Sequence, residues 1–562
     1  MERSNSRPLR FLAAVALIAL LFAAGFAPGL GAPFERDEGE YAHAADLLAS
    51  GGLPYRDTFL QKPPGIFLVY AAVQSIAGRS DTAIHLSALA SYLGAVLVLA
   101  ALARRLGGDL AGVLAALLAA LGFLSPLNEP HPANTEAFLI LPATAAYAIL
   151  VRAWDVARAG GERHRLVRLA SASGLCLGIA SLFKQVALAH APHLLLGWLL
   201  VARLRRERSI LALAFVATTI LPWVLALSPW WAAGALGDFL EGVLLHNLRY
   251  VAFNPEGGFG ELLARRVAVA SLFDRLFWIA GVAGAVALAA LGRRRGAFVA
   301  AGWLATAVLG VSAGGYFRGH YLLQAVPPLA LSAALAASSL PSPLALVAAT
   351  GLVATWVAAR PVDIGADAAA QSFARYAGMR FANGPAIGRI LASDAAARGW
   401  RTLFVLGSEP QLLHYSGLLA VTRWVIASPL TGGHAGSRER QEETWEAVRR
   451  AHPDYVVVSV PAAVPMFRHS DTFLWGRVVD LVRRDYEPLG KTSAVHRGVM
   501  RPGADVPPDF VPDLWIFRRR AAGGPTVDAD GAPATAVAPS EIDWPPSDPA
   551  PEALLRGNPP AR

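Results

Sequence analysis

The sequence has 562 residues, of which 54% are hydrophobic and only 16% are charged. Soluble domains carry about 25% charged residues, so the deficit indicates that lipid is the main environment of this chain. The net charge is +9, but the arginines occur in short clusters between apolar runs. This pattern is typical of membrane-protein orientation signals and argues against a nucleic-acid surface. The single cysteine, Cys176, excludes a disulfide within the chain and lies in an apolar run, where a small buried side chain is expected.

Long apolar runs predict a polytopic α-helical membrane protein, because a span needs about 20 apolar residues. The first run follows Arg3, Arg7 and Arg10 and also resembles a secretory signal, but its length and the later runs favour an uncleaved anchor. A further apolar segment, 66–77, is too short to cross and is expected to lie in the membrane interface. About eleven spans are predicted, at 11–33, 83–103, 110–127, 137–151, 169–183, 187–202, 210–228, 273–292, 297–314, 320–337 and 343–359.

The arginine clusters between these spans fix the expected orientation. They lie at 104–105, 152–168, 203–208 and 293–295, and each falls at an end that the span count makes cytoplasmic. The loops at the other ends are therefore expected on the outer face of a bacterial inner membrane. The longest of them includes 238–250, whose apolar spacing predicts an amphipathic helix.

The first outer loop, 34–65, carries six carboxylates and is the strongest candidate for a site. Asp37 and Glu38 are expected near the start of a short helix, pointing about 100° apart, so that one faces a substrate and the other orients it. Tyr41 lies one turn later on the same face. The structural alternative is a solvated acidic helix start that the helix dipole stabilises.

The loop ends in Lys62-Pro63-Pro64-Gly65. The two prolines fix an extended backbone and end any preceding helix. They would hold the Lys62 ammonium at head-group depth, where a cation suits a lipid phosphate. The alternative is a lysine that extends from a span end toward water.

Other polar residues are expected on the same outer face. Asn134-Thr135-Glu136 starts a span, where capping is the structural alternative to a second acidic wall of the site. Four histidines, His43, His131, His246 and His320, could ligate a metal, but no ligand spacing supports a metal site and no cofactor is expected. The remaining substrate-binding candidates are Lys184, Arg249, Tyr250, Arg318, His320 and Tyr321.

From about residue 360 the charges return and the apolar runs shorten. Strands are predicted at 402–406, 455–460 and 513–518, with helices at 383–398, 438–452 and 473–484. This alternation predicts a small α/β domain, which eleven spans place outside the cytoplasm. The expected domains are a membrane domain over 1–360, the extracytoplasmic α/β domain over 361–520 and a disordered Pro/Ala-rich tail over 521–562.

No phosphate-binding loop, nucleophile elbow or zinc-protease motif occurs, which argues against nucleotide hydrolysis and serine hydrolysis. The motifs that do occur resemble those of GT-C fold glycosyltransferases, and especially glycosyltransferase family 39. This family includes protein O-mannosyltransferases and the lipid A aminoarabinose transferases. The resemblance is carried by D-E-G-E-Y from Asp37, by G-G-L-P-Y-x-D from Gly51 and by K-P-P-G from Lys62.

The resemblance implies inverting transfer of a sugar from a polyprenyl-phosphate donor to an acceptor hydroxyl. It implies that Asp37 is the general base, that Glu38 supports it and that Lys62 holds the donor phosphate. Gln61 stands where aminoarabinose transferases carry an acid, which argues against lipid A as the acceptor. Protein hydroxyls, cell-envelope glycans and lipids stay open as acceptors. The alternatives are a membrane transporter of a small polar or lipid-linked solute and a non-catalytic anchoring protein.

Overall fold

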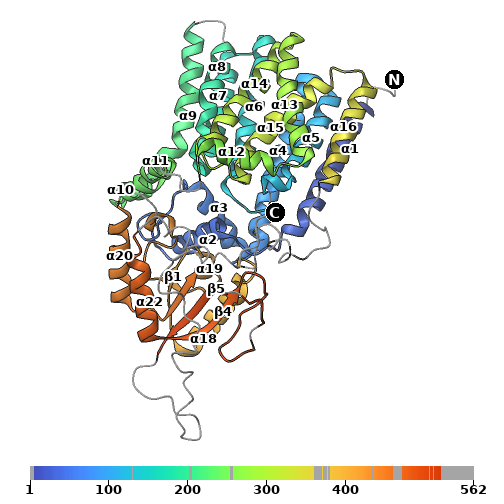
Figure 1. Cartoon of the computed structure of the whole chain (residues 1–562). Helices are drawn as coiled ribbons and strands as arrows, with labels where there is room; N and C mark the ends of the chain where they lie inside the picture. Colours follow the sequence, from blue (N-terminus) through green and yellow to red (C-terminus); the bar gives the residue numbers. More distant parts are fainter. Residues whose placement is uncertain are drawn as a thin grey trace, which may run out of the picture. The chain divides into compact units, whose positions relative to one another are not determined.

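The chain forms two compact units. The computed structural model describes residues 6–129, 131–201, 205–252, 257–359, 367, 370, 372, 376, 380–431, 436–459, 471–505, 507–510 and 512–520 (Figure 1). The membrane unit comprises Met1–Gly31, Gln61–Val243 and Glu256–Ala366. The α/β unit comprises Ala32–Leu60, Leu244–Pro255 and Asp367–Arg562. The acidic loop thus groups with the C-terminal part of the chain, and the predicted tail lies outside the described residues.

The described residues of the membrane unit form helices joined by turns and short loops. Short 3-10 segments, η3 (Gln185–His190) and η5 (Gly319–Ala325), precede α8 and α15. The α-helices are α1 (Ser6–Phe26), α3 (Gly65–Ala77), α4 (Asp81–Gly107), α5 (Asp109–Phe123), α6 (Thr135–Arg158), α7 (Arg163–Phe183), α8 (Ala191–Val201), α9 (Arg205–Ala232), α10 (Leu236–Leu240), α12 (Phe259–Ala268), α13 (Leu272–Ala290), α14 (Arg294–Ser312), α15 (Val326–Ala337) and α16 (Ser342–Ala358).

Helices occupy all eleven predicted span positions. In the described part of the chain, 8 helices are long and apolar enough to cross a membrane. The predicted spans 110–127, 187–202 and 343–359 correspond to the shorter apolar helices Asp109–Phe123, Gln185–Val201 and Pro343–Ala358. The predicted break at Lys184 is confirmed, because α7 ends at Phe183.

Small residues let neighbouring membrane helices approach closely. Gly174 and Gly178 of α7 face α9, and an ideal β-carbon on Gly174 would lie 2.9 Å from the backbone carbonyl carbon of Phe215. Lipid gives no hydrophobic driving force for helix association. Small residues compensate because they let helix backbones approach closely and gain van der Waals contact.

The arginine clusters of α4, α6 and α14 meet at one end of this bundle. Asp155, near the end of α6, lies 3.1 Å from Arg295 at the start of α14. It also lies 3.5 Å from Arg105 at the end of α4. Three predicted same-side clusters are therefore neighbours in space, which supports the span order that was read from the charges.

The α/β unit is built on a five-stranded sheet with the order β2-β1-β3-β5-β4. β1 (Thr402–Leu406), β2 (Leu419–Ala420) and β3 (Tyr455–Ser459) are parallel, while β5 (Pro512–Arg519) runs antiparallel to β3 and to β4 (Tyr486–Ser493). The helices of this unit are α2 (Arg36–Ala49), α11 (His246–Ala252), α18 (Gly384–Arg398), α19 (Gln411–Ser416), α20 (Ser437–Ala451) and α22 (Phe473–Asp485).

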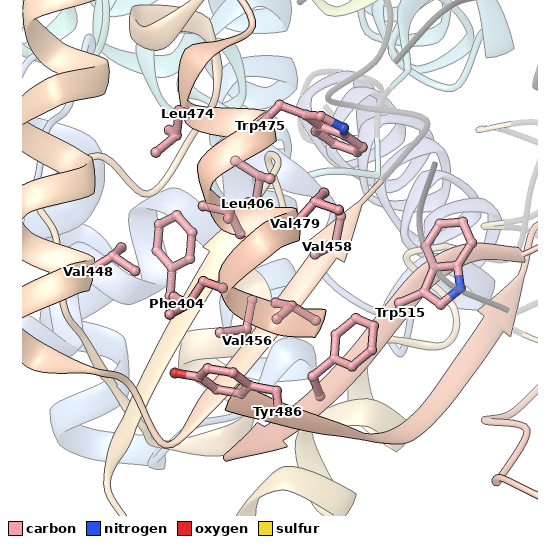
Figure 2. Close-up of a cluster of buried hydrophobic side chains, with 14 of the residues drawn as sticks. Phe404, Leu406, Val448, Val456, Val458, Leu474, Trp475, Val479, Tyr486 and Trp515 are labelled. Carbon is pink, nitrogen blue, oxygen red and sulfur yellow. The ribbon is translucent and has the colours of Figure 1, made fainter. Parts of the chain in front are cut away.

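Alternate strand residues face two separate cores, as a strand period of two requires. On one face, Phe404 and Val456 pack with Val448 of α20 and Trp475 of α22 (Figure 2). On the other face, Val405 packs with residues of α18 and α19. The sheet is therefore covered by helices on both sides, and the predicted α/β domain is confirmed.

The loop from the N-terminal half contributes to this fold. Phe59 is buried in the same core as Phe404 and Trp475. Its backbone N–H donates to the Arg423 carbonyl at 2.7 Å. The sequence predicted β1, β3, β5, α18, α20 and α22 within a few residues, but it missed the short β2 and α19 and the strand β4.

Candidate functional site

The acidic helix α2 carries Asp37 and Glu38 in its first turn. Glu35 is the N-cap residue, and its carboxylate accepts from the Glu38 backbone N–H at 3.2 Å. The Glu38 carboxylate accepts in turn from the Glu35 N–H, also at 3.2 Å, which completes a capping box. Glu38 is therefore buried and holds the helix start, whereas Asp37 is half-buried. The expected part of Glu38 in supporting a catalytic base stays a prediction.

Two ionisable side chains of the acidic loop, Glu35 and Tyr55, are buried. Burial raises the pKa of Glu35 well above its usual range, and the charges of Asp37 and Glu38 raise it further. Burial also raises the pKa of the Tyr55 hydroxyl, to which the charge of Glu40 adds. Tyr41, the other predicted residue of this helix, is fully buried. Burial in this loop therefore favours the neutral forms of the Glu35 carboxyl and the Tyr55 hydroxyl.

The membrane unit brings together three predicted residues at the end opposite its arginine clusters. Lys184, which follows α7, donates a hydrogen bond to Glu136 in the first turn of α6. The Thr135 hydroxyl donates to the other Glu136 oxygen at 2.7 Å. The Lys184 ammonium also lies 3.5 Å from the centroid of the Tyr321 ring. Asn134 makes no capping hydrogen bond with its side chain, so simple capping does not explain this acid.

A second group of charges lies beside this pair and was not fully predicted. His320 Nδ1 lies 3.1 Å from Glu129 Oε2, and the Arg266 guanidinium reaches the same carboxylate at 4.0 Å. The His320 and Tyr321 rings pack edge to face, which joins the two groups. Glu129 lies between α5 and α6, at a left-handed φ of 49°. Arg266 gave no local signal, because it was one of many arginines.

The other predicted residues divide between the units. Lys62 belongs to the membrane unit and is half-buried before α3. Arg318 is exposed in the same unit, 5.8 Å from the Tyr316 ring. Arg249 and Tyr250 lie on α11 of the α/β unit, where Tyr250 stacks on His246. Because Asp37 and Lys62 belong to different units, their meeting in one pocket stays a prediction.

A polar cluster inside the membrane unit was missed by the sequence reasoning. His190 Nδ1 lies 2.8 Å from the Thr306 hydroxyl, and both contact the hydroxyl of Tyr147. These groups come from η3, α14 and α6 and satisfy one another. Polar pairs of this kind hold membrane helices together, so the cluster is explained by packing.

The described residues contain no group of three or more His, Cys, Asp or Glu side chains arranged to hold a metal ion. Of the four histidines considered, His43 and His246 belong to the α/β unit, and His131 and His320 belong to the membrane unit.

These features define a class: a polytopic membrane protein with an appended α/β unit and buried charges at one end of its helices. Residues 61–232 match the profile of the family described as dolichyl-phosphate-mannose-protein mannosyltransferase. A search of curated proteins found no match by sequence.

Solved structures give the fold. The structure of ArnT from Cupriavidus metallidurans bound to undecaprenyl phosphate is similar at a TM-score of 0.54, covering 81% of this chain and 93% of that chain at 16% identity. The apo structure of the same ArnT is similar at a TM-score of 0.52. That alignment covers 92% of this chain and 98% of the ArnT chain at 16% identity. An oligosaccharyltransferase from Archaeoglobus fulgidus, in complex with zinc and sulfate, is similar at a TM-score of 0.52. That alignment covers 89% of this chain and 74% of the oligosaccharyltransferase chain at 13% identity. The chain has the GT-C glycosyltransferase fold, as the resemblance in its sequence implied.

Proposed function

We propose that this protein transfers a sugar from a polyprenyl-phosphate donor to an acceptor hydroxyl, with inversion, on the outer face of a bacterial inner membrane. The observation that carries the proposal is the GT-C fold, shared at a TM-score of 0.54 with ArnT bound to undecaprenyl phosphate. The α/β unit would then lie outside the cytoplasm. The sugar, whether hexose or pentose, and the acceptor, whether protein, glycan or lipid, are left to experiment.

In this proposal Asp37 is the general base and takes the proton of the acceptor hydroxyl. The hydroxyl oxygen attacks the anomeric carbon, and the bond to the phosphate oxygen breaks with its electron pair on the phosphate. A phosphate leaves as an anion and needs no general acid, so one base and fixed cations suffice. Glu38 supports the base by closing the capping box with Glu35.

Lys62 is proposed to bind the donor phosphate, with Arg318, Arg249 and Tyr250 as further contacts. Lys184 is held against Glu136 and Tyr321, so its charge is already partly neutralised. We therefore propose that Lys184, Glu136 and Tyr321, together with His320, form a polar wall of the substrate site. A buried ion pair in a membrane domain is costly and usually marks a substrate site.

The test is mass spectrometry of lipid-linked sugars in cells that lack the gene. A polyprenyl-phosphate sugar is expected to accumulate and to disappear when the wild-type protein is restored. The Asp37→Asn protein, produced at the same level, is expected to leave the accumulated lipid in place. Deletion without any change in the lipid-linked sugars would contradict the proposed donor class.

A further inference from the structure

The helix that carries Asp37 is held by the C-terminal part of the chain at its start and toward its end. Before the helix, the Phe34 N–H donates to the Tyr415 hydroxyl at 2.7 Å. Toward its end, Asp46 Oδ2 lies 2.7 Å from Nδ1 of His414, a side chain that is 1% exposed. Both partners, Tyr415 and His414, are on α19, more than 360 residues away in sequence.

The residues on either side of Asp37 are fixed most closely. Arg36 Nε donates to the Ser408 carbonyl at 3.1 Å. Gly39 lies against the backbone of α19, where an ideal β-carbon would stand 2.7 Å from the Gln411 α-carbon. Only a glycine permits this approach, because any side chain would force one helix away from the other. The backbone that bears the Asp37 carboxylate is thus clamped one residue before it and two residues after it.

The point of attachment is the place where α/β sheets usually bind ligands. Ser408 comes two residues after β1, at the carboxyl edge of the parallel strands. β1 lies between β2 and β3 in the sheet. The next strand in the chain, β2, therefore pairs with one side of β1, and the strand after it, β3, pairs with the other side. Open α/β sheets form their binding crevice at such a switch point. In this unit, the start of α2 reaches that edge through Arg36.

We propose that the α/β unit positions the acidic helix for catalysis, and that Gly39, Tyr415 and His414 are positioning residues that set the location of the Asp37 carboxylate. The inference rests on the proposed function, in which Asp37 is the base. A displacement of about 1 Å in a reacting group costs about 100-fold in rate. The contacts of α19 with α2 would therefore control the rate of transfer through the position of the Asp37 carboxylate alone.

The first experiment measures hydrogen exchange in purified full-length protein. Gly39→Ala and Tyr415→Phe are expected to speed exchange of the α2 amides. The matched control is Gly476→Ala on α22, where a β-carbon meets no atom within 4 Å. That control should leave α2 unchanged, because it gains helix propensity without a clash. Unchanged α2 exchange in Gly39→Ala protein would overturn the docking itself.

The second experiment measures transfer in the same proteins. Gly39→Ala is expected to lower kcat about 100-fold with little change in the donor KM, and Tyr415→Phe to lower it by up to about tenfold. In an Asp37→Asn background, Gly39→Ala should cause no further loss, because the group that it displaces is already inactive. An equal loss in both backgrounds, or full transfer by Gly39→Ala protein whose α2 exchanges faster, would overturn the positioning role. Normal transfer by Asp37→Asn protein would instead contradict the proposed function, and the exchange result would still decide whether α19 holds α2.

Discussion

Lys184 donates a hydrogen bond to Glu136, and the two side chains are buried together at one end of the membrane unit. They lie 48 residues apart in sequence, on either side of the α6–α7 hairpin. Neither charge could be buried there alone, because an uncompensated charge in a low-dielectric site is strongly destabilising.

Replacing Lys184 by methionine should therefore destabilise the protein by about 3–5 kcal/mol, since it leaves the Glu136 carboxylate buried without its cation. Adding Glu136→Gln should restore most of the loss. The measurement is thermal or denaturant unfolding in detergent. The control is Arg265→Met, which breaks an exposed pair with Glu261 and should cost about 0–1 kcal/mol. A double variant as unstable as Lys184→Met alone would contradict this account.

Asp37→Asn should lower transfer by about 10²–10⁴-fold while the protein level stays normal, because the amide cannot accept the acceptor proton. The assay is sugar transfer by purified protein in lipid nanodiscs. Asp57→Asn is the matched control: Asp57 lies in the same loop but pairs with the exposed Arg56. Comparable losses in both variants would remove the special role of Asp37.

Lys62→Met should raise the KM for the polyprenyl-phosphate donor by about 10–100-fold, the worth of a charge-assisted hydrogen bond. Its kcat should change much less, because the contact exists before and during the reaction. Lys62→Arg should retain most of the affinity. Lys491→Met in β4 serves as the control, since it removes the same charge from the α/β unit. An unchanged donor KM in Lys62→Met protein would contradict the proposal that Lys62 binds the donor phosphate.

Asp513 should make the stability of the α/β unit depend on pH. Burial raises the pKa of this carboxyl from 3.8 to about 6, although Thr492 donates a hydrogen bond to it. A raised pKa means that the neutral form is favoured in the folded state. The stabilisation is present below pH 3.8 and is lost as the pH rises through about 6.

The corresponding variant is Asp513→Asn, which keeps an acceptor for Thr492 but cannot ionise. At pH 8 it should be more stable than wild type by about 3 kcal/mol, and the difference should shrink toward pH 4. Unfolding of the full-length protein across this range measures the effect. Asp505→Asn, an exposed carboxylate of the same unit, should show no such trend. Parallel pH curves for wild type and Asp513→Asn would contradict the assignment.

Much of the fold followed from local pattern. The apolar runs predicted the helices because a bilayer-length helix has a length and composition that few other structures need. The runs at 402–406 and 455–460 predicted β1 and β3 because buried parallel strands are continuously apolar. β4 was missed because Pro488 and Gly490 interrupt its pattern, and both residues coincide with a register shift in its pairing.

The candidate site was predicted only in part. The sequence identified Glu136, Lys184 and Tyr321 separately, as polar residues at span ends, and the structure joined them. It also offered two explanations for Glu38, and the capping box with Glu35 decides that this carboxylate holds the helix start. Arg266 was missed because its partner Glu129 is 137 residues away, and the sequence carries no mark of such a pairing.

The sequence by itself determined that this is a polytopic helical protein with a separate α/β part, because hydrophobic period and run length are local properties of the chain. It also singled out Asp37 and Lys62, because proline and charge act on their immediate surroundings. Only the tertiary structure decided that the acidic loop groups with the α/β unit. The sequence gives no reason for a glycine at position 39. The reason is the close contact with the backbone of Gln411, a residue more than 350 positions later in the chain.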